Sequence, residues 1–340
     1  MSGDVSQKTE RSAAQRDIQS HVRMLRADLE RRWSSASGRV HEISRYALLP
    51  AGKLLRPLLL LESARAVGGA SPAVVSAALG VEYLHVGSLV HDDVIDNDEL
   101  RRGRPSVLAR NGVADAIVTG DALLLTMFVA LTECVDHGVP AAAVLEAVRV
   151  LAEAGVDLCR GQAMESDMVG NLDCGLDRYL TMIGLKTGAL FRGACHSGAL
   201  LGGGSPAQVQ LMARFGEHLG LAFQIHDDLL SYIADSEVLG KPTASDVTNR
   251  RPTYPVLIAY QVAGPADRAR LELALSGQLS ETDAYGLMKE LLDTTGALAL
   301  TRERAAHEVR LATGCLADLP GEDGVAVLAA IAESSINRER

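Results

Sequence analysis

Two apolar runs that end in paired aspartates constrain the fold of this chain more than any other feature. The first run, "SLVHDDVIDND" at residues 88–98, contains four aspartates, and the second, "AFQIHDDLLSY" at residues 222–232, contains two. Burying an ionised carboxylate without a partner costs several kcal/mol. Each run therefore predicts a helix that is buried along its apolar part and carries carboxylates that need a cation or solvent.

The rest of the sequence predicts an all-α protein. No convincing alternation of apolar and polar residues indicates a strand, and clusters such as "LGGGSP" and "VAGPAD" separate roughly ten or more helical segments. The chain has 340 residues, 47% of them hydrophobic, so it can bury a large core. No linker marks a domain boundary. We expect a flexible N-terminal tail at residues 1–20 and a single all-helical domain at residues 21–340.

Charge and composition exclude several classes of protein. A net charge of −10 argues against nucleic acid as a partner, because phosphate backbones bind basic surfaces. The five cysteines have no metal-ligand spacing, and the polar N-terminus has no secretory apolar region. Reduced thiols in a cytoplasmic protein are the expectation. Glycines and a proline interrupt the longest charge-free stretch, residues 193–213, so no membrane span is predicted.

The first aspartate cluster has the spacing of a metal site. On a helix, Asp92 and Asp96 lie one turn apart on one face, with Asp93 about 100° round. Like charges about 4 Å apart repel by about 4 kcal/mol at an effective dielectric constant of 20. Mg²⁺ suits such a cluster because it takes one or two carboxylates together with substrate phosphates and water. An acidic helix end in solvent is the alternative, and the second pair, Asp227 and Asp228, favours the metal site.

Basic segments lie beside both clusters. "LRRGRPS" at residues 100–106 follows the first, and "GKPTASDVTNRRP" at residues 240–252 follows the second. A third segment, "AGKLLRPLLLL", places Lys53 and Arg56 near a helix start marked by Pro57, where backbone N–H groups favour an anion. Carboxylates for metal beside basic groups for oxyanions suit a polyphosphate. Simple charge balance between neighbours is the alternative.

Taken together, the motifs resemble a known family. GKxxRP, HDDxxD followed by RRGRP, GQ, KTGxLF, FQxxDD and GKxxxSD occur in this order between about residues 45 and 260. This set resembles the trans-isoprenyl diphosphate synthases, or polyprenyl synthetases, and looks closest to geranylgeranyl diphosphate synthases. The resemblance implies an all-α bundle around a deep central cavity, a homodimer, and an enzyme that joins isopentenyl diphosphate head-to-tail to an allylic diphosphate.

The resemblance also implies a role for each matching residue. It implies that about three Mg²⁺ ions on the allylic diphosphate are held by carboxylates, namely Asp92, Asp93, Asp96, Asp227 and Asp228. It implies an isopentenyl diphosphate site at Lys53, Arg56, His85 and Arg102. It implies allylic diphosphate ligands at Arg101, Lys186 and Lys241, and polar groups facing the developing cation at Thr187 and Gln224. Gln162 occupies the family's glutamine position, and Glu165 stands where aspartate is common.

Two departures and two small residues distinguish this chain within the family pattern. Ser231 replaces the usual third aspartate of the second motif, and Arg251 stands where lysine is commoner. In the family, bulky aromatic residues at the positions of Gly87 and Ser88 form a floor that ends chain growth at a short product. Small residues there predict a product longer than farnesyl diphosphate, with geranylgeranyl diphosphate favoured over longer chains. The alternative is that both residues simply permit close helix packing.

Three other functions are alternatives to this one. A class I terpene cyclase would share the fold and the metals, but it would not need the isopentenyl diphosphate site at Lys53, Arg56, His85 and Arg102. A noncatalytic partner subunit would be expected to lose the first aspartate cluster, which is complete here. A ferritin-type di-metal bundle would carry paired ExxH motifs, which this sequence lacks.

Overall fold

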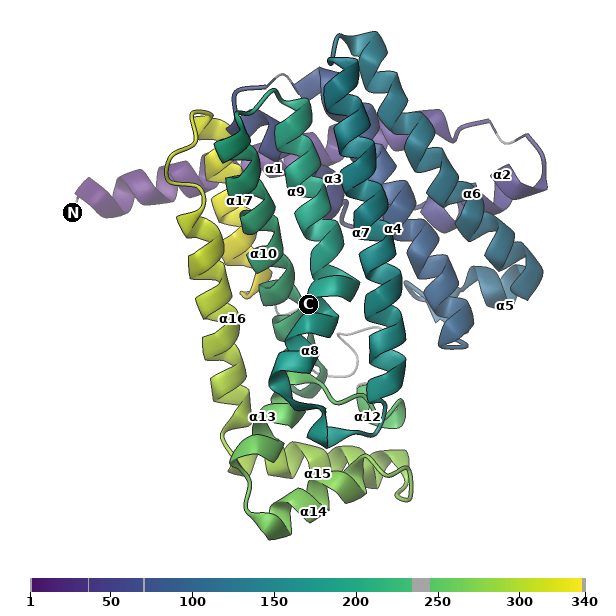
Figure 1. Cartoon of the computed structure of the whole chain (residues 1–340), viewed down its shortest axis with the longest axis vertical. Coiled ribbons are helices and arrows are strands. Elements are labelled where there is room, and N and C mark those ends of the chain that lie inside the picture. Colours follow the sequence, from purple (N-terminus) through teal and green to yellow (C-terminus); the bar gives the residue numbers. More distant parts are fainter. Residues whose placement is uncertain (1, 36, 70, 234–244, 338–340) are drawn as a thin grey trace. The chain divides into compact units, whose positions relative to one another are not determined.

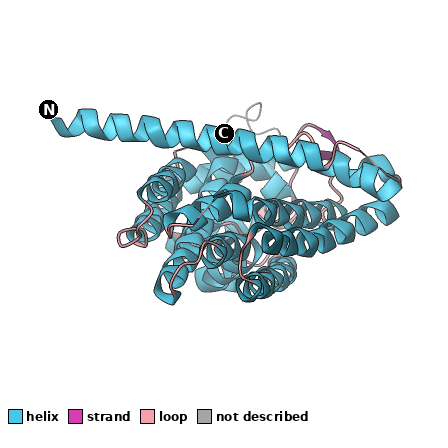
Figure 2. Cartoon of the chain, turned by 90° about the horizontal axis from the view of Figure 1, so that it is seen from above, coloured by secondary structure: helices cyan, strands magenta, loops and turns pink. Residues whose placement is uncertain are grey.

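The computed structural model describes residues 2–337 except 36, 70 and 234–244, and it omits the side chains of residues 2–12, 71 and 245. Helices make up nearly all of the described chain, which confirms the all-α prediction (Figures 1 and 2). Backbone contacts divide the chain into two compact units, and each is described by itself. Unit 1 comprises residues 1–155, 190–216 and 315–331, and unit 2 comprises residues 156–189, 217–314 and 332–340.

Unit 1 contains the N-terminal helices. They are α1 (Ser2–Arg32), α2 (Arg39–Leu48), α3 (Leu55–Ala66), η1 (Ser71–Val74), α4 (Val75–Ile95), α5 (Val107–Asn111), α6 (Val113–Thr132) and η2 (Glu133–His137). Parts of α7 (Ala141–Met168), α9 (Ala189–Leu201), α10 (Pro206–Ile233) and α17 (Glu322–Ser335) complete it. Because α1 begins at Ser2, the segment that we expected to be a flexible tail is helical in this structure.

Helix α4 is the central element of unit 1 because it carries the first aspartate cluster. Its buried residues lie all round the helix, as an apolar helix in a core requires. It packs against α6 at Gly87, where an added Cβ would lie 3.0 Å from the carbonyl oxygen of Gly120 and 3.3 Å from Leu123 Cβ. Close helix packing, the alternative interpretation of Gly87, therefore describes what the structure shows at this residue.

Two described segments are long and apolar enough to cross a membrane by composition alone. They are residues 72–95, which include α4, and residues 113–137, which include α6. The most apolar window of the first is 72% buried inside the protein, as in a core helix, and that of the second is 33% buried. Core helices of soluble proteins pass the same test, so this pattern does not indicate a membrane span.

A short hairpin interrupts the helices of unit 1. Strands β1 (Leu100–Arg101) and β2 (Arg104–Pro105) pair antiparallel, with Arg101 opposite Arg104. Arg102 and Gly103 form the turn with φ of 53° and 72°, the left-handed backbone that a two-residue hairpin turn needs. Strands of two residues are too short to give an alternating pattern, which is why the sequence did not indicate them.

Unit 2 is built from the C-terminal helices around one core. It contains the remainder of α7 and α10, η3 (Leu172–Cys174), α8 (Gly175–Ile183), the π-helical turn η4 (Gly184–Gly188), α12 (Ser245–Thr248), α13 (Tyr254–Val262), α14 (Pro265–Ala274), α15 (Glu281–Thr294) and α16 (Ala297–Gly314). Its core draws apolar residues from α7, α8, α10 and each helix from α12 to α16, among them Ile183, Ile225, Leu257, Leu291 and Ala305. This core fixes the part of α10 that carries the second aspartate pair.

Candidate active site

The first aspartate cluster lies at the carboxyl end of α4. The helix ends at Ile95, and the backbone N–H of Asp96 still bonds to the carbonyl of Asp92 at 2.8 Å. Asp92 and Asp96 are half-buried, whereas Asp93 is buried. The carboxyl end of a helix is already partly negative, so three carboxylates there are unfavourable unless a cation compensates them. The protein's own Arg101 supplies part of that compensation at Asp93, and the half-buried Asp92 and Asp96 are placed where a bound cation would supply more.

The hairpin brings its arginines to different partners. Arg101 Nε donates to Asp93 Oδ1 at 2.8 Å, so the hairpin is tied to the aspartate cluster. Arg104 donates instead to the carbonyl oxygens of Leu49 and Tyr46, at 2.7 and 2.5 Å, which anchors the hairpin to the end of α2. Arg101 and Arg104, two of the three arginines of "RRGR", thus donate hydrogen bonds to oxygen atoms of the protein itself.

The residues predicted to bind isopentenyl diphosphate are linked by contacts within unit 1. Arg56 lies in the first turn of α3, and its Nη1 donates to His85 Nε2 on α4 at 3.1 Å. Arg102 lies against the loop before α3, because a Cβ added at Gly52 would be 2.7 Å from its Nη2. Lys53, in the same loop, is exposed. We call Lys53, Arg56, His85 and Arg102 the arginine cluster.

Burial and positive charge shift the pKa values of the groups within this cluster. Burial first, and then Arg56 and Arg102, lower the pKa of His85 well below its usual value, so the imidazole is neutral and accepts from Arg56. Glu82, one turn earlier on α4, is 3% exposed. Burial raises the pKa of Glu82, while Arg102 and Arg56 lower it. Glu82 was not among the predicted residues, because a single glutamate in an apolar helix has no distinctive spacing.

In unit 2, a π-helical turn presents the KTG motif. Lys186 and Thr187 lie within η4, and such turns often occur at functional sites. Helix α7 packs directly against this turn at Gly161, where an added Cβ would lie 2.6 Å from Lys186 Cα. The glycine of the GQ motif is therefore required for this close approach.

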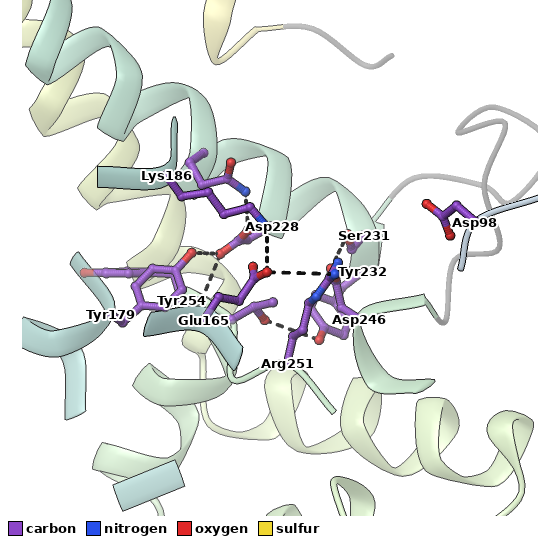
Figure 3. Close-up of polar contacts among 12 residues, drawn as sticks. Asp98, Glu165, Tyr179, Lys186, Asp228, Ser231, Tyr232, Asp246, Arg251 and Tyr254 are labelled. Atoms are coloured by element: carbon purple, nitrogen blue, oxygen red, sulfur yellow. Dashed lines mark hydrogen bonds and ion pairs between the residues drawn. The ribbon is translucent and has the colours of Figure 1, made fainter. Parts of the chain in front are cut away.

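A cavity of about 130 Å³ lies beside this turn, and we call it the carboxylate cavity. Its lining is Glu165, Met168, Tyr179, Met182, Ile183, Lys186, Thr187, Gln224, Asp228, Asp246, Arg251, Pro252 and Thr253. Figure 3 shows Glu165 between two basic side chains, with Lys186 Nζ at 2.5 Å and Arg251 Nη2 at 3.9 Å from its Oε2. The cavity thus combines three carboxylates, two basic groups and an apolar wall.

Asp228 is the most heavily hydrogen-bonded carboxylate of the cavity. Its Oδ2 accepts from the hydroxyl of Tyr179 and from the backbone N–H of Tyr254 at 3.0 Å (Figure 3). Its Oδ1 accepts from Gln224 Nε2 at 2.9 Å. Gln224 in turn accepts from Thr187 Oγ1 at 2.8 Å. Thr187, Gln224 and Asp228, all predicted site residues, therefore form one hydrogen-bonded chain.

Burial and a neighbouring carboxylate make the ionised form of Asp228 unfavourable. Burial first, and then Asp246, raise the pKa of Asp228 to about 7, although its three donors oppose that shift. Burial and Asp228 raise the pKa of Tyr179 well above its usual value, so this hydroxyl stays protonated and donates. Tyr179 was not among the predicted residues, because no motif connects it with a carboxylate 49 residues away.

The remaining predicted residues are placed as follows. Asp227 is exposed on α10. Gln162 on α7 has a buried Oε1 that lacks a hydrogen-bond partner among the described residues. Ser88 is half-buried and donates its hydroxyl to the carbonyl of His85 at 2.8 Å. Lys241 lies outside the described residues. That both aspartate clusters face one cavity stays a prediction.

Comparison with known proteins identifies the family. The polyprenyl synthetase family model matches residues 38–293. The short chain isoprenyl diphosphate synthase of Methanothermobacter thermautotrophicus is 36% identical over 296 residues, which cover 87% of this chain and 89% of that protein. This chain belongs to the polyprenyl synthetase family. It is a trans-prenyltransferase, and the resemblance stated from its motifs is confirmed.

Solved structures of polyprenyl synthetases share this fold. The geranylgeranyl pyrophosphate synthetase of Pyrococcus horikoshii matches with a TM-score of 0.86 and 30% identity, covering 96% of this chain and 98% of that one. A polyprenyl synthase of Caulobacter crescentus, complexed with calcium and isoprenyl diphosphate, matches with a TM-score of 0.85 and 28% identity, covering 98% of each chain. Other relatives are named geranylgeranyl, geranylfarnesyl, octaprenyl and farnesyl diphosphate synthases.

The donor set of this polyprenyl synthetase fits a hard divalent cation. No three His, Cys, Asp or Glu side chains converge into a metal-binding group within the described part of the chain. Mg²⁺ does not need such a cage, because it completes its shell with substrate phosphates and water. The carboxylates at the end of α4 and on α10 supply the oxygen ligands that it prefers.

Proposed function

We propose that this polyprenyl synthetase condenses isopentenyl diphosphate head-to-tail with an allylic diphosphate, in a Mg²⁺-dependent reaction that yields geranylgeranyl diphosphate or a similar all-trans product. The arginine cluster carries the proposal. Arg56 bonds to a neutral His85, and Arg102 lies close to the same imidazole, so two guanidinium groups gather where a diphosphate can be bound. A cyclase, which acts on one diphosphate, has no need of this second anion site.

The proposed mechanism assigns the chain's own residues to two tasks. Arg56 and Arg102 hold isopentenyl diphosphate by charge-assisted hydrogen bonds. Lys186 and Arg251 place positive charge beside the allylic diphosphate as it leaves. Bound Mg²⁺ supplies further positive charge to that leaving group. Met182 and Ile183 give the cavity an apolar wall against which an allylic cation is kept from water.

The alkene of isopentenyl diphosphate then attacks the allylic carbon. The bond from that carbon to the diphosphate oxygen breaks, a new carbon–carbon bond forms, and a proton is lost to the departed diphosphate. Within the carboxylate cavity, the oxygens of Thr187 and Gln224 lie 2.8 Å apart and offer partial negative charge to the cation. No nucleophilic serine or cysteine is required.

Product length is the finer part of the proposal. Relatives carry names that run from farnesyl to octaprenyl synthases. We favour geranylgeranyl diphosphate because Gly87 and Ser88, five and four residues before Asp92, are both small. Gly87 contributes less to this argument than Ser88, because the space beside Gly87 is taken by α6. Ser88→Phe is expected to shorten the product, and an unchanged product distribution would show that Ser88 does not border the growing chain.

Product analysis tests the whole proposal. The purified protein is incubated with Mg²⁺, isopentenyl diphosphate and, in separate tubes, dimethylallyl, geranyl or farnesyl diphosphate, and the products are measured by mass spectrometry. Elongated diphosphates that need isopentenyl diphosphate support a prenyl synthase and give its chain length. A hydrocarbon or alcohol formed from an allylic diphosphate alone would make the protein a cyclase. No turnover in any tube would favour the noncatalytic subunit.

We also propose that the enzyme is a homodimer and that it acts in the cytoplasm. For the homodimer, the supporting observation is an apolar stripe on α6, where Ile117, Val118, Leu125 and Val129 are 45–65% exposed. Exposed apolar surface of this kind marks an interaction site. Light scattering should give the mass of two chains, and Leu125→Glu should give that of one. Unchanged dimers in Leu125→Glu would place the interface elsewhere, and capture of the protein by lipid vesicles would indicate a membrane surface instead.

A further inference from the structure

The second aspartate motif of this chain is short of one carboxylate. Ser231 stands at its third aspartate position, so α10 supplies only Asp227 and Asp228. Asp228 is buried and already accepts three hydrogen bonds from the protein. Asp227, by contrast, is exposed. A metal ion bound at this motif would therefore meet a single exposed carboxylate from α10.

A carboxylate from another element lies at the vacant position. Asp246, on α12, accepts a hydrogen bond at its Oδ2 from Ser231 Oγ at 2.9 Å (Figure 3). Its side chain is only 17% exposed, and it lines the carboxylate cavity. Ser231 thus donates to a carboxylate at the place where the family pattern would have one of its own.

Both partners of this hydrogen bond are held from other sides. The carbonyl of Ser231 accepts from the hydroxyl of Tyr285 on α15 at 3.1 Å. The carbonyl of Asp246 accepts from the backbone N–H of Arg251 at 2.8 Å, and Arg251 Nη1 lies 3.9 Å from Asp246 Oδ1. The hydroxyl of Ser231, together with the guanidinium of Arg251, therefore sets the direction in which the carboxylate of Asp246 points.

Helix geometry places Asp227 near this hydrogen bond. Asp227 lies four residues, or about one turn, before Ser231 on α10, so the two side chains share one face of the helix. Ser231 holds Asp246 by the hydrogen bond to its Oδ2, so Asp246 lies at the same face of α10 as Asp227. Two carboxylates so placed repel each other, and a divalent cation between them relieves that repulsion.

We propose that Asp246 supplies the carboxylate that the second motif lacks, and that Ser231 is a positioning residue that holds it beside Asp227. The cation ligands in this part of the site are then Asp227 and Asp246, and Asp228 keeps a structural role. This inference rests on the proposed function, since it concerns the divalent cation of that reaction. It predicts that the carboxylate can be moved from residue 246 to residue 231 without losing the cation.

A charge-relocation series tests the proposal without turnover. The variants are Asp246→Asn, Ser231→Asp, the double variant with both changes, Ser231→Ala and Ser231→Thr. The control is Asp293→Asn, which removes an exposed carboxylate of α15 outside the cavity. Calorimetry measures the affinity of each protein for Mg²⁺ in the presence of inorganic pyrophosphate, and circular dichroism confirms that each variant is folded.

We expect Asp246→Asn to weaken Mg²⁺ binding by about 10- to 100-fold and the double variant to recover most of that loss. Ser231→Ala should weaken binding by roughly 10-fold because Asp246 loses its donor, and Ser231→Thr, which keeps the hydroxyl, should restore it. Asp293→Asn should bind as the wild type does. A purely structural role for Asp246 would not allow rescue by a carboxylate at residue 231.

Three results would overturn the inference. Wild-type affinity in Asp246→Asn would show that Asp246 is not a ligand. A double variant no better than Asp246→Asn would show that residue 231 is not the equivalent position. If Ser231→Ala weakens Mg²⁺ binding and Ser231→Thr weakens it equally, the hydroxyl of residue 231 does not position Asp246. Failure of the proposed function is separate, because it would appear as wild-type protein that binds Mg²⁺ and pyrophosphate but forms no elongated diphosphate.

Discussion

The arginine cluster of unit 1 and the carboxylate cavity of unit 2 both bury ionisable groups, but the pKa values are lowered in the first and raised in the second. In the arginine cluster, burial and neighbouring cations lower the pKa of His85, and burial also lowers that of Arg102. In the carboxylate cavity, burial and neighbouring carboxylates raise the pKa of Asp228 to about 7 and raise that of Asp246. The first region is therefore suited to an anionic ligand, and the second region to a cationic one.

The difference also lies in how each region is held together. The carboxylate cavity has a dense network, in which Asp228 alone accepts three hydrogen bonds. In the arginine cluster, the guanidinium groups come from the first turn of a helix, where Arg56 bonds to His85, and from a hairpin turn, where Arg102 lies. We therefore expect mutations in the cavity to act mainly on stability and metal binding, and mutations in the arginine cluster to act mainly on substrate affinity.

The largest effect should come from the network of the cavity. Asp228→Ala leaves three buried donors without their acceptor and should lower the free energy of unfolding by about 2–4 kcal/mol. Asp228→Asn should cost clearly less, because the amide of Gln224 can turn over and present its oxygen to the new amide. Denaturant unfolding without metal measures both variants. Equal losses would mean that shape, and not hydrogen bonding, is what Asp228 contributes.

The next effect separates the two regions by ligand. Arg102→Gln should raise the KM for isopentenyl diphosphate by roughly 10- to 100-fold, because it removes a charge-assisted contact. The Mg²⁺ affinity measured with inorganic pyrophosphate should not change. The matched control is Arg149→Gln, which alters an exposed arginine of α7 that pairs only locally with Glu146 and Glu153. A parallel loss of Mg²⁺ affinity in Arg102→Gln would contradict the division between the regions.

The smallest expected effect is a pH dependence in unit 1. The pKa of His85 is depressed in the folded protein, so below its usual value of 6.5 the unfolded chain binds a proton that the folded protein does not. Stability should therefore fall as the pH drops, by about 1 kcal/mol between pH 6.5 and about 5.5. His85→Gln keeps an acceptor for Arg56 and should remove this part of the slope. An identical slope in wild type and variant would show that His85 is protonated when folded.

Much of the fold followed from local sequence patterns. The glycine and proline clusters separated the helices correctly, for example at residues 202–205 between α9 and α10. Pro57 lies in the first turn of α3, as its fixed φ predicted. The linear order of the motifs also identified the family, because each motif is a short run of residues whose spacing survives in the sequence itself.

Several site residues could not be predicted because they depend on contacts between distant parts of the chain. Tyr179 and Asp228 are 49 residues apart, and Ser231 and Asp246 are 15 residues apart. The π turn at Lys186 and the close approach of Gly161 depend on how α7 packs, which periodicity does not encode. Gly87 illustrates the same limit. From the sequence, a glycine at this position could either border the tunnel for the product or permit close packing of two helices.

By itself, then, the sequence determined the helices, the family and the kinds of residue that meet the substrates, because these depend on propensity and short-range spacing. Only the tertiary structure decided which carboxylates accept hydrogen bonds from the protein and which face the cavity. Asp227 and Asp228 are adjacent in the sequence, yet one is exposed and the other is buried among three donors. Burial and hydrogen bonding are properties of packing, and packing brings together residues whose separation along the chain carries no signal.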